Sequence, residues 1–205
     1  MKETFATISL RTDDPDEVAA LLGESEAFVS PPLLGWVTVY ERLADEGDLA
    51  RLAELASLLS EALACPALVF LVLAGDVFFY LLFEEGELRD EYASEPEYFG
   101  ATTLEERASL RGTPERLLPY AVPGVTAATL RAILDDPSLS PVARCQALAD
   151  RLGILNATLG YYDLAAKLEG AEVPVIGWED FQLTHAEEEF AEADPSPPSQ
   201  NGLCQ

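Results

Sequence analysis

The chain has 205 residues, 37 acidic and 12 basic, and its formal charge at pH 7 is −25. Phosphate backbones and anionic lipid headgroups repel such a chain, which argues against nucleic-acid or membrane-surface binding. Hydrophobic residues make up 49% of the chain, which is enough for a core, and the length suits one ordinary domain.

The first residues show alternating strand and helix signals. Residues 3–11 alternate in part like a strand, and Asp14 followed by proline is typical of a helix start. This helix is short, because Gly23 ends it. A loop rich in large apolar groups follows at residues 28–34, and residues 35–42 then predict a second strand.

Residues 48–64 give the clearest helix signal, with an apolar stripe wide enough to pack on a sheet. The stretch 62–83 contains a single charge, Asp76, and matches a membrane span in length. Because glycine and Asp76 form a tight-turn signal, we favour two buried strands at 67–73 and 77–83 instead.

The second half of the chain is mainly helical. A short, charged strand at 88–92 suits the edge of a sheet, where charge discourages further pairing. Helices are then predicted to start after Thr103, Thr113 and Ser140, each of which precedes a helical pattern. Residues 159–168 are ambiguous between helix and strand, and 173–181 predict a last strand containing Trp178.

Together these elements predict an α+β fold, with a mixed or mostly antiparallel sheet of about five strands, packed helices and a helical C-terminal half. Residues 1–100 would form the sheet portion and 101–185 a helical portion packed on it, within one domain. The Glu-, Asp-, Pro- and Ser-rich composition of residues 186–205 predicts a disordered acidic tail. Three scattered cysteines and an N-terminus without an apolar core indicate a cytoplasmic protein.

Residue types that mark catalytic or cofactor sites are scarce. The one histidine, His185, lies at the start of the expected tail, where a solvated side chain is the simpler interpretation. No glycine-rich nucleotide-binding motif and no Cys/His cluster occur. We therefore predict no catalytic, cofactor-binding or metal-ligating residues and no cofactor.

The most distinctive string is DEYASEPEYFG at residues 90–100, which follows the predicted edge strand. Tyrosines, a serine, a proline and acids in one loop are typical of a segment that is pinned or that meets a partner. The plainer alternative is a proline turn in which Tyr98 and Phe99 anchor the helical half to the sheet.

On these residues the chain resembles an uncharacterised bacterial family, whose members share an apolar strand, an acidic-glycine turn and an ending like Tyr92-x-Ser94-x-Pro96-x-Tyr98-Phe99. The similarity extends over most of residues 35–161 and includes Gly35-Trp36-Val37, Leu152-Gly153-Ile154 and Gly160-Tyr161. The family prefers asparagine where this chain has Ala93. The resemblance implies no activity, but it implies that residues 67–99 form one structural unit.

Three functions remain open. The first is a non-catalytic cytoplasmic interaction or regulatory module whose partner is another protein. Its possible partner surface comprises Phe28, Leu33, Leu34, Trp36, Tyr92, Ser94 and Tyr98. The second is an acidic inhibitor or immunity-type protein that mimics nucleic acid, supported by the net charge of −18 on residues 1–178. The third is a carboxylate- or metal-dependent enzyme, which requires several of Asp76, Asp90, Glu91 and Glu95 to converge.

Overall fold

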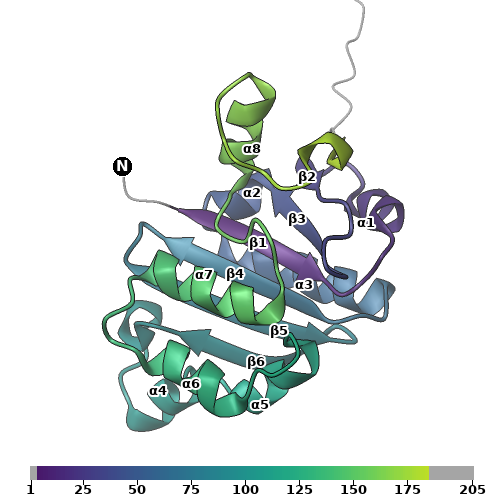
Figure 1. The fold of residues 1–205 in the computed structure, drawn as a ribbon. Helices are drawn as coiled ribbons and strands as arrows, with labels where there is room; N and C mark the ends of the chain where they lie inside the picture. Colours follow the sequence, from purple (N-terminus) through teal and green to yellow (C-terminus); the bar gives the residue numbers. More distant parts are fainter. Residues whose placement is uncertain (1–3, 185–205) are drawn as a thin grey trace, which may run out of the picture.

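The computed structural model describes residues 4–184, so His185 and the expected tail at 186–205 lie outside the described residues. Within 4–184 the chain folds into one seven-stranded antiparallel sheet with helices on both faces (Figure 1). The strand order is β6-β5-β4-β1-β3-β2-β7. The predicted α+β fold is confirmed, and the sheet has two strands more than the sequence suggests.

The strands are β1 (Phe5–Leu10), β2 (Ala27–Val29), β3 (Val37–Glu41), β4 (Ala67–Leu73), β5 (Val77–Glu84), β6 (Glu87–Ala93) and β7 (Gln182–Thr184). The prediction of a loop at 28–34 is wrong at its start, because Phe28 and Val29 belong to β2 and pair with β3. The strand predicted at 173–181 is also wrong, since Trp178 begins a 3₁₀ turn and β7 follows it. Strands of three residues are too short to show a period of two.

The helices are α1 (Pro15–Leu22), α2 (Arg42–Asp45), α3 (Leu49–Ala62), α4 (Leu104–Ser109), α5 (Pro114–Leu117), α6 (Ala127–Asp135), α7 (Pro141–Leu152) and α8 (Tyr161–Leu168). Three 3₁₀ turns, η1 (Pro96–Phe99), η2 (Leu118–Tyr120) and η3 (Trp178–Asp180), complete the described elements. The Asp14, Thr103 and Ser140 side chains accept hydrogen bonds from backbone N–H groups of the first helical turns, which confirms the predicted starts.

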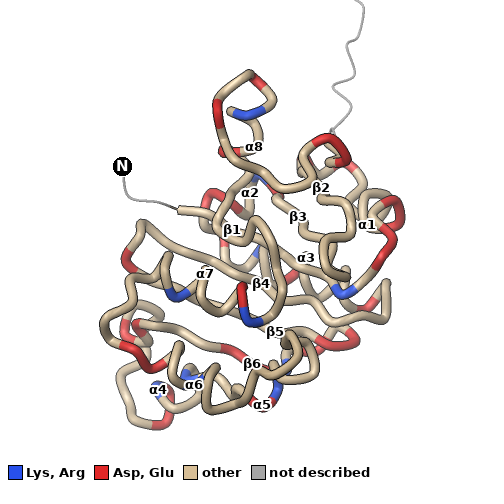
Figure 2. The backbone as a smooth tube through the Cα atoms, in the orientation of Figure 1, with Lys and Arg blue, Asp and Glu red and all other residues tan. Residues whose placement is uncertain are grey.

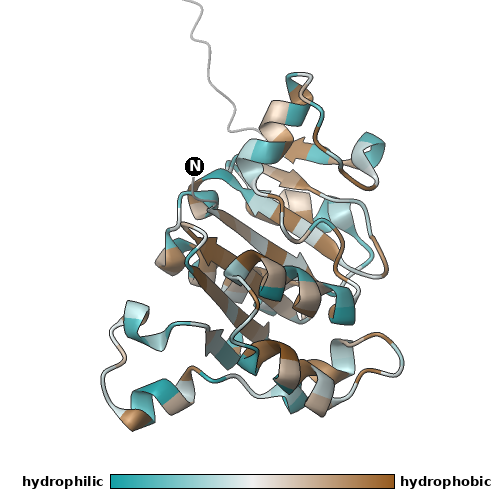
Figure 3. Cartoon of the chain, turned by 60° about the vertical axis from the view of Figure 1, so that its left-hand side comes forward, coloured by the Kyte–Doolittle hydropathy of each residue, from teal (hydrophilic) through white to brown (hydrophobic). Residues whose placement is uncertain are grey.

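Two cores sandwich the sheet, because β4 and β5 are apolar on both faces. Val69 and Leu71 point into a core covered by α1 and α3, and Phe70 and Val72 point into a core covered by α5, α6 and α7. We call these the α3 face and the α7 face. Figure 3 shows these central strands as the most hydrophobic part of the sheet. Burial on both faces explains why the sequence here is almost continuously apolar.

The β4–β5 hairpin is confirmed, with Leu73 opposite Val77 at its turn. The apolar stretch 62–83 therefore consists of the end of α3 and two buried strands. None of the helices within residues 4–184 has the length and apolar character needed to cross a bilayer.

Strand β6 forms one edge of the sheet, as its charged sequence predicts, and the chain returns to pair with the last two residues of that strand. The Ala93 N–H donates to the Leu110 carbonyl at 2.9 Å, and Tyr92 forms a β-bridge with Arg111. Ser94 and Glu95, which directly follow β6, line a pocket together with residues of α6 and α7.

Candidate functional site

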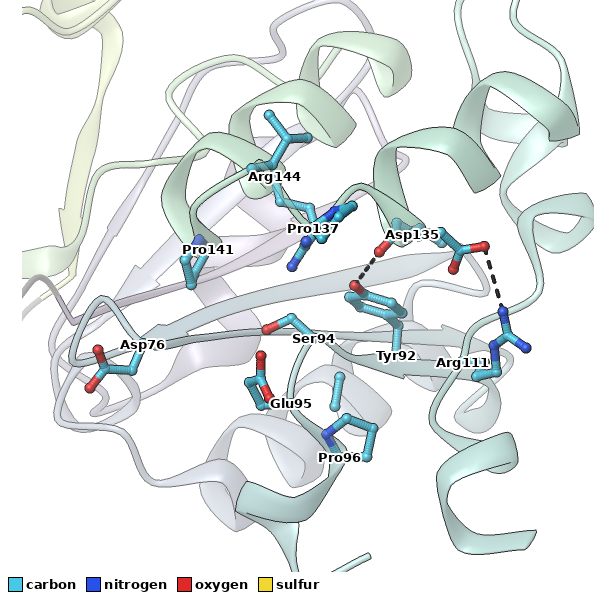
Figure 4. A pocket seen from close by; sticks show the side chains of 13 residues that line it. Asp76, Tyr92, Ser94, Glu95, Pro96, Arg111, Asp135, Pro137, Pro141 and Arg144 are labelled. Atoms are coloured by element: carbon cyan, nitrogen blue, oxygen red, sulfur yellow. Dashed lines mark hydrogen bonds and ion pairs between the residues drawn. The ribbon is translucent and has the colours of Figure 1, made fainter. Parts of the chain in front are cut away.

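A polar pocket of about 590 Å³ lies where the end of β6 meets the corner between α6 and α7 (Figure 4). Its floor is the end of β6 with Ser94, and one wall is formed by residues 134–144. The opposite wall consists of Glu95, Pro96 and the β4–β5 turn at Asp76. The volume falls within the range typical of small-molecule ligand sites.

The floor of the pocket is fixed by backbone pairing. The Ser94 N–H donates to the Phe78 carbonyl at 2.9 Å, and the Phe78 N–H donates to Ser94 Oγ at 3.0 Å. These bonds extend the sheet one residue beyond β6 and hold Oγ in place. A hydroxyl that accepts from an amide still carries its own proton, so Ser94 can donate to a ligand.

The Tyr92 hydroxyl joins the floor to the far wall, because it donates to the Leu134 carbonyl at 2.6 Å. Burial raises the pKa of Tyr92 above its usual value, which keeps the hydroxyl protonated and able to donate. The bond lies at the C-terminal end of α6, where carbonyl groups lack partners within the helix. Tyr92 therefore sets the distance between the sheet and the α6–α7 corner.

Arg144 reaches the pocket from the first turns of α7. Its Nε donates to the Ile133 carbonyl at 3.3 Å, and its Nη2 donates to the Asp136 carbonyl. The residue is only 7% exposed and is the one buried basic side chain in the part of the chain that the structure describes. Arg144 therefore caps the C-terminus of α6 and places a positive charge beside the pocket.

The mouth of the pocket carries a second arginine, which has an acidic partner. Arg111 Nη2 lies 3.5 Å from Asp135 Oδ2, and Arg131 Nη1 lies 3.4 Å from Asp135 Oδ1. Both Arg111 and Asp135 are well exposed, so water screens this pair and it adds little stability. Asp135 is thus paired with two arginines, and Asp76 and Glu95 belong to the opposite wall.

The four carboxylates considered for an enzyme do not converge. Asp76 and Glu95 line this pocket. Asp90 is buried on the α7 face, where it accepts from the Tyr80 hydroxyl at 2.7 Å. Glu91 lines a different pocket, beside Phe99 and α4, and burial raises its pKa. Among residues 4–184 no three His, Cys, Asp or Glu side chains are grouped to hold a metal ion.

The structure separates the seven residues of the possible partner surface. Tyr92 and Ser94 meet in the pocket, whereas Phe28 and Trp36 are 2% and 1% exposed and pack in the core. Leu33 is half-buried. Leu34 and Tyr98 are exposed, but Leu34 lies between β2 and β3 and Tyr98 lies in η1. Only the Tyr92–Ser94 part of the set therefore contributes to a concave site.

Sequence reasoning missed the contribution of the α6–α7 corner to this pocket. The helix start at Ser140 was recognised, but nothing in the local sequence distinguished Arg144 from a solvated arginine. Comparison with protein-family models, with curated proteins and with solved structures gives no match. The resemblance to an uncharacterised bacterial family stays a prediction.

Proposed function

We propose that the protein is a non-catalytic cytoplasmic interaction module that holds a segment of a partner protein in the pocket between β6 and the α6–α7 corner. The pocket itself is the observation that carries the proposal. Separate parts of the chain build it, and hydrogen bonds that involve Ser94, Tyr92 and Arg144 fix its lining. A site fixed before binding loses little entropy when a segment enters it.

Proline residues support the same proposal. Pro96, Pro137 and Pro141 all line the pocket, and each restricts the backbone of a loop or of a first helical turn. A partner segment would therefore meet rigid walls rather than mobile loops. The pocket is partly open to solvent, which suits an extended segment better than a fully enclosed small molecule.

The environment of Ser94 favours binding over catalysis. A nucleophilic serine donates its proton to a neighbouring base, which a third group orients. Ser94 Oγ instead accepts a bond from a backbone N–H, and no hydrogen bond joins it to a carboxylate within the described residues. Ser94 therefore supports the proposal as a ligand donor.

The hypothesis of an acidic inhibitor that mimics nucleic acid is supported by the net negative charge of the chain. Residues 4–184 contain 31 acidic and 11 basic residues, which gives a charge of −20. Figure 2 shows the acids at turns and helix ends around the whole outline rather than in one stripe. A nucleic-acid mimic needs a continuous acidic surface, so this distribution gives the pocket proposal the stronger support.

Peptide selection tests the proposal. A library of random peptides displayed on phage is selected on the folded protein, and the affinities of the enriched peptides are then measured by fluorescence anisotropy. Leu139→Trp fills the pocket, whereas Leu168→Trp makes the same change at an exposed position on α8. We expect Leu139→Trp to weaken binding at least about tenfold, or 1.4 kcal/mol, and Leu168→Trp to leave it unchanged.

Two results would contradict the proposal. One is the absence of enriched peptides after selection on the native protein. The other is equal binding by the wild type and Leu139→Trp while Leu139→Trp keeps the melting temperature of the wild type.

A further inference from the structure

A second pocket, of about 430 Å³, is lined by residues of β5, β6, η1, α4 and the start of α3. We propose that this pocket receives a basic side chain of a partner protein, with the charged group at Glu91 and the aliphatic stem against apolar walls. The pocket lies on the α3 face, whereas the pocket of the proposed function lies beside the helices of the α7 face. The two sites can therefore be tested separately.

The alternation of side chains along β6 directs Glu91 into this pocket. Asp90 is buried on the α7 face, and Tyr92 packs in the core of that face. Because successive side chains of a strand point to opposite faces, Glu91 points to the α3 face, as Ala93 does. There it lies opposite Leu81 of β5, which belongs to the apolar core. A carboxylate thus occupies an otherwise apolar part of the sheet.

Glu91 has no positively charged partner. Its side chain makes no hydrogen bond or ion pair within residues 4–184, and the nearest basic residues in sequence, Arg89 and Arg107, pair with other glutamates. Burial raises the pKa of Glu91, and the negative charge of Asp90 raises it further. A half-buried carboxylate in this environment costs free energy, which an ammonium or guanidinium group at Glu91 would offset.

The walls of the pocket match the stem of a basic side chain. They are formed by Leu49, Phe79, Phe99, Ala101 and Leu110. The ring centroids of Phe79 and Phe99 lie 4.7 Å apart, which makes part of the wall aromatic. Lysine and arginine bury their methylene groups along apolar surface while the charged end reaches a polar group, and aromatic faces attract cations. One long basic side chain can therefore use the apolar walls and Glu91 together.

The charges around the pocket favour a cation over an anion. The described residues that line it include Glu91 and Glu106 and no lysine or arginine. Glu106 is exposed, and hydrogen bonds from the N–H groups of Thr103 and Thr102 lower its pKa and keep it ionised. The net charge of −20 on residues 4–184 also attracts cations to the surface.

Exposed apolar side chains beside the pocket favour a protein segment over a free amine. The exposed Tyr98 ring packs against Phe99, with 5.4 Å between the ring centroids. Leu104 is 87% exposed and begins α4, the helix that forms one wall. A free amine would leave both side chains in water, whereas the residues that flank a basic side chain in a protein segment can cover them.

Blocked amino acids test the site directly. Nα-acetyl-lysine methylamide and Nα-acetyl-arginine methylamide carry the stem and the charge, Nα-acetyl-norleucine methylamide carries a stem without charge, and methylammonium carries a charge without a stem. Each compound is titrated at constant ionic strength, and the amide shifts of Glu91, Phe99, Ala101 and Leu110 are followed by NMR. We expect at least one basic derivative to saturate these shifts with a dissociation constant on the order of 1 mM. The norleucine derivative and methylammonium should bind at least about tenfold more weakly.

Glu91→Gln tests the charge while it keeps the shape of the side chain. It should weaken binding of the basic derivatives at least about tenfold. The melting temperature at pH 7 should stay the same or rise, because the variant removes a half-buried carboxylate that has no partner. Glu115→Gln is the matched control, since it removes one negative charge at an exposed position on α5 and should leave binding unchanged.

Ser109→Trp tests the location, because it adds a large side chain at a residue that lines the pocket. It should weaken binding at least about tenfold. Ala108→Trp makes a similar addition at the neighbouring exposed position of α4, which does not line the pocket, and should leave binding unchanged.

Several outcomes would overturn the inference. If neither basic derivative saturates the shifts, the pocket does not bind basic side chains. Equal binding of methylammonium would show attraction of any cation to the acidic surface, and equal binding of the norleucine derivative would show an apolar site only. Unchanged binding by a folded Glu91→Gln or Ser109→Trp would also overturn it. At least about tenfold tighter binding of 1-butylammonium than of the lysine derivative would assign the pocket to a free amine. Each of these results leaves the proposed function untouched.

Discussion

Asp45 provides the sharpest test of the energetics of this fold. Its side chain is 4% exposed and lies between β1 and the start of α8. Oδ1 accepts from the Ala6 N–H at 2.9 Å, and Oδ2 accepts from the Tyr162 N–H at 3.3 Å. Burial is the main cause that raises the pKa of Asp45 from 3.8 to about 6, and the nearby negative charge of Asp163 adds to it. The backbone N–H donors act in the opposite direction but do not offset the burial.

The sign of the pH effect follows from this raised pKa. The folded protein binds the Asp45 proton more tightly than the unfolded chain, so protonation stabilises the fold. The contribution is fully present below pH 3.8 and is lost as the pH rises through about 6. Because the isoelectric point is near 4.1, measurements are best kept between pH 5.0 and 7.5. Over that range linkage gives a change of about 1.4 kcal/mol from this group.

Urea unfolding of the wild type and of Asp45→Asn, followed by circular dichroism, measures this contribution. Asparagine has nearly the same shape and does not titrate. The free energy of unfolding of the wild type, relative to Asp45→Asn, should rise by about 1.4 kcal/mol from pH 7.5 to 5.0. Asp13→Asn at an exposed aspartate is the matched control and should show no such trend. A pH-independent difference for Asp45→Asn, or a decrease on acidification, would refute the reasoning.

Three further predictions concern packing and reactivity. Gly160→Ala should lower the free energy of unfolding by about 2–3 kcal/mol in urea, because the new Cβ would lie 2.4 Å and 2.6 Å from the Asp45 oxygens. Tyr80→Phe should lower the free energy of unfolding by about 1–3 kcal/mol in the same assay, because it removes a hydrogen-bond donor to the buried Asp90 carboxylate. Tyr98→Phe, at an exposed site, is the control and should change the free energy of unfolding by less than about 0.5 kcal/mol. Cys145 is fully buried, and burial raises the pKa of its thiol. Iodoacetamide should therefore alkylate Cys145 only after unfolding, as measured by peptide mapping with mass spectrometry. Alkylation of Cys145 in the native protein would contradict its burial.

Local signals in the sequence predicted local structure well. The Asp14 and Ser140 caps and the hairpin around Asp76 depend on residues a few positions apart, so the sequence contains all the information they need. The order of the strands does not depend on neighbours in sequence. For instance, β7 pairs with β2 through Ala27 and Thr184, and no pattern within a three-residue strand indicates such a partner.

The difference between local and long-range contacts also explains which residues of the candidate site the sequence could indicate. Tyr92 and Ser94 lie close together in the distinctive string at residues 90–100, and both line the pocket. Arg144 lies about fifty residues later, directly before Cys145, on a helix whose start after Ser140 the sequence predicts. Its burial depends on the carbonyl groups that α6 exposes at its end, which is a tertiary contact. A sequence pattern therefore predicts the helix but not the buried charge.

Tyrosine hydroxyls show how the fold accommodates so many acids with so few bases. Four hydroxyl groups donate to carboxylates within the described residues, in the pairs Tyr80–Asp90, Tyr120–Glu84, Tyr161–Glu26 and Tyr162–Glu46. Burial and the neighbouring negative charges raise the pKa of each of these tyrosines, so each remains a neutral donor at neutral pH. A neutral donor satisfies a carboxylate without cancelling its charge. The strongly negative surface and the hydrogen-bonded interior are therefore compatible.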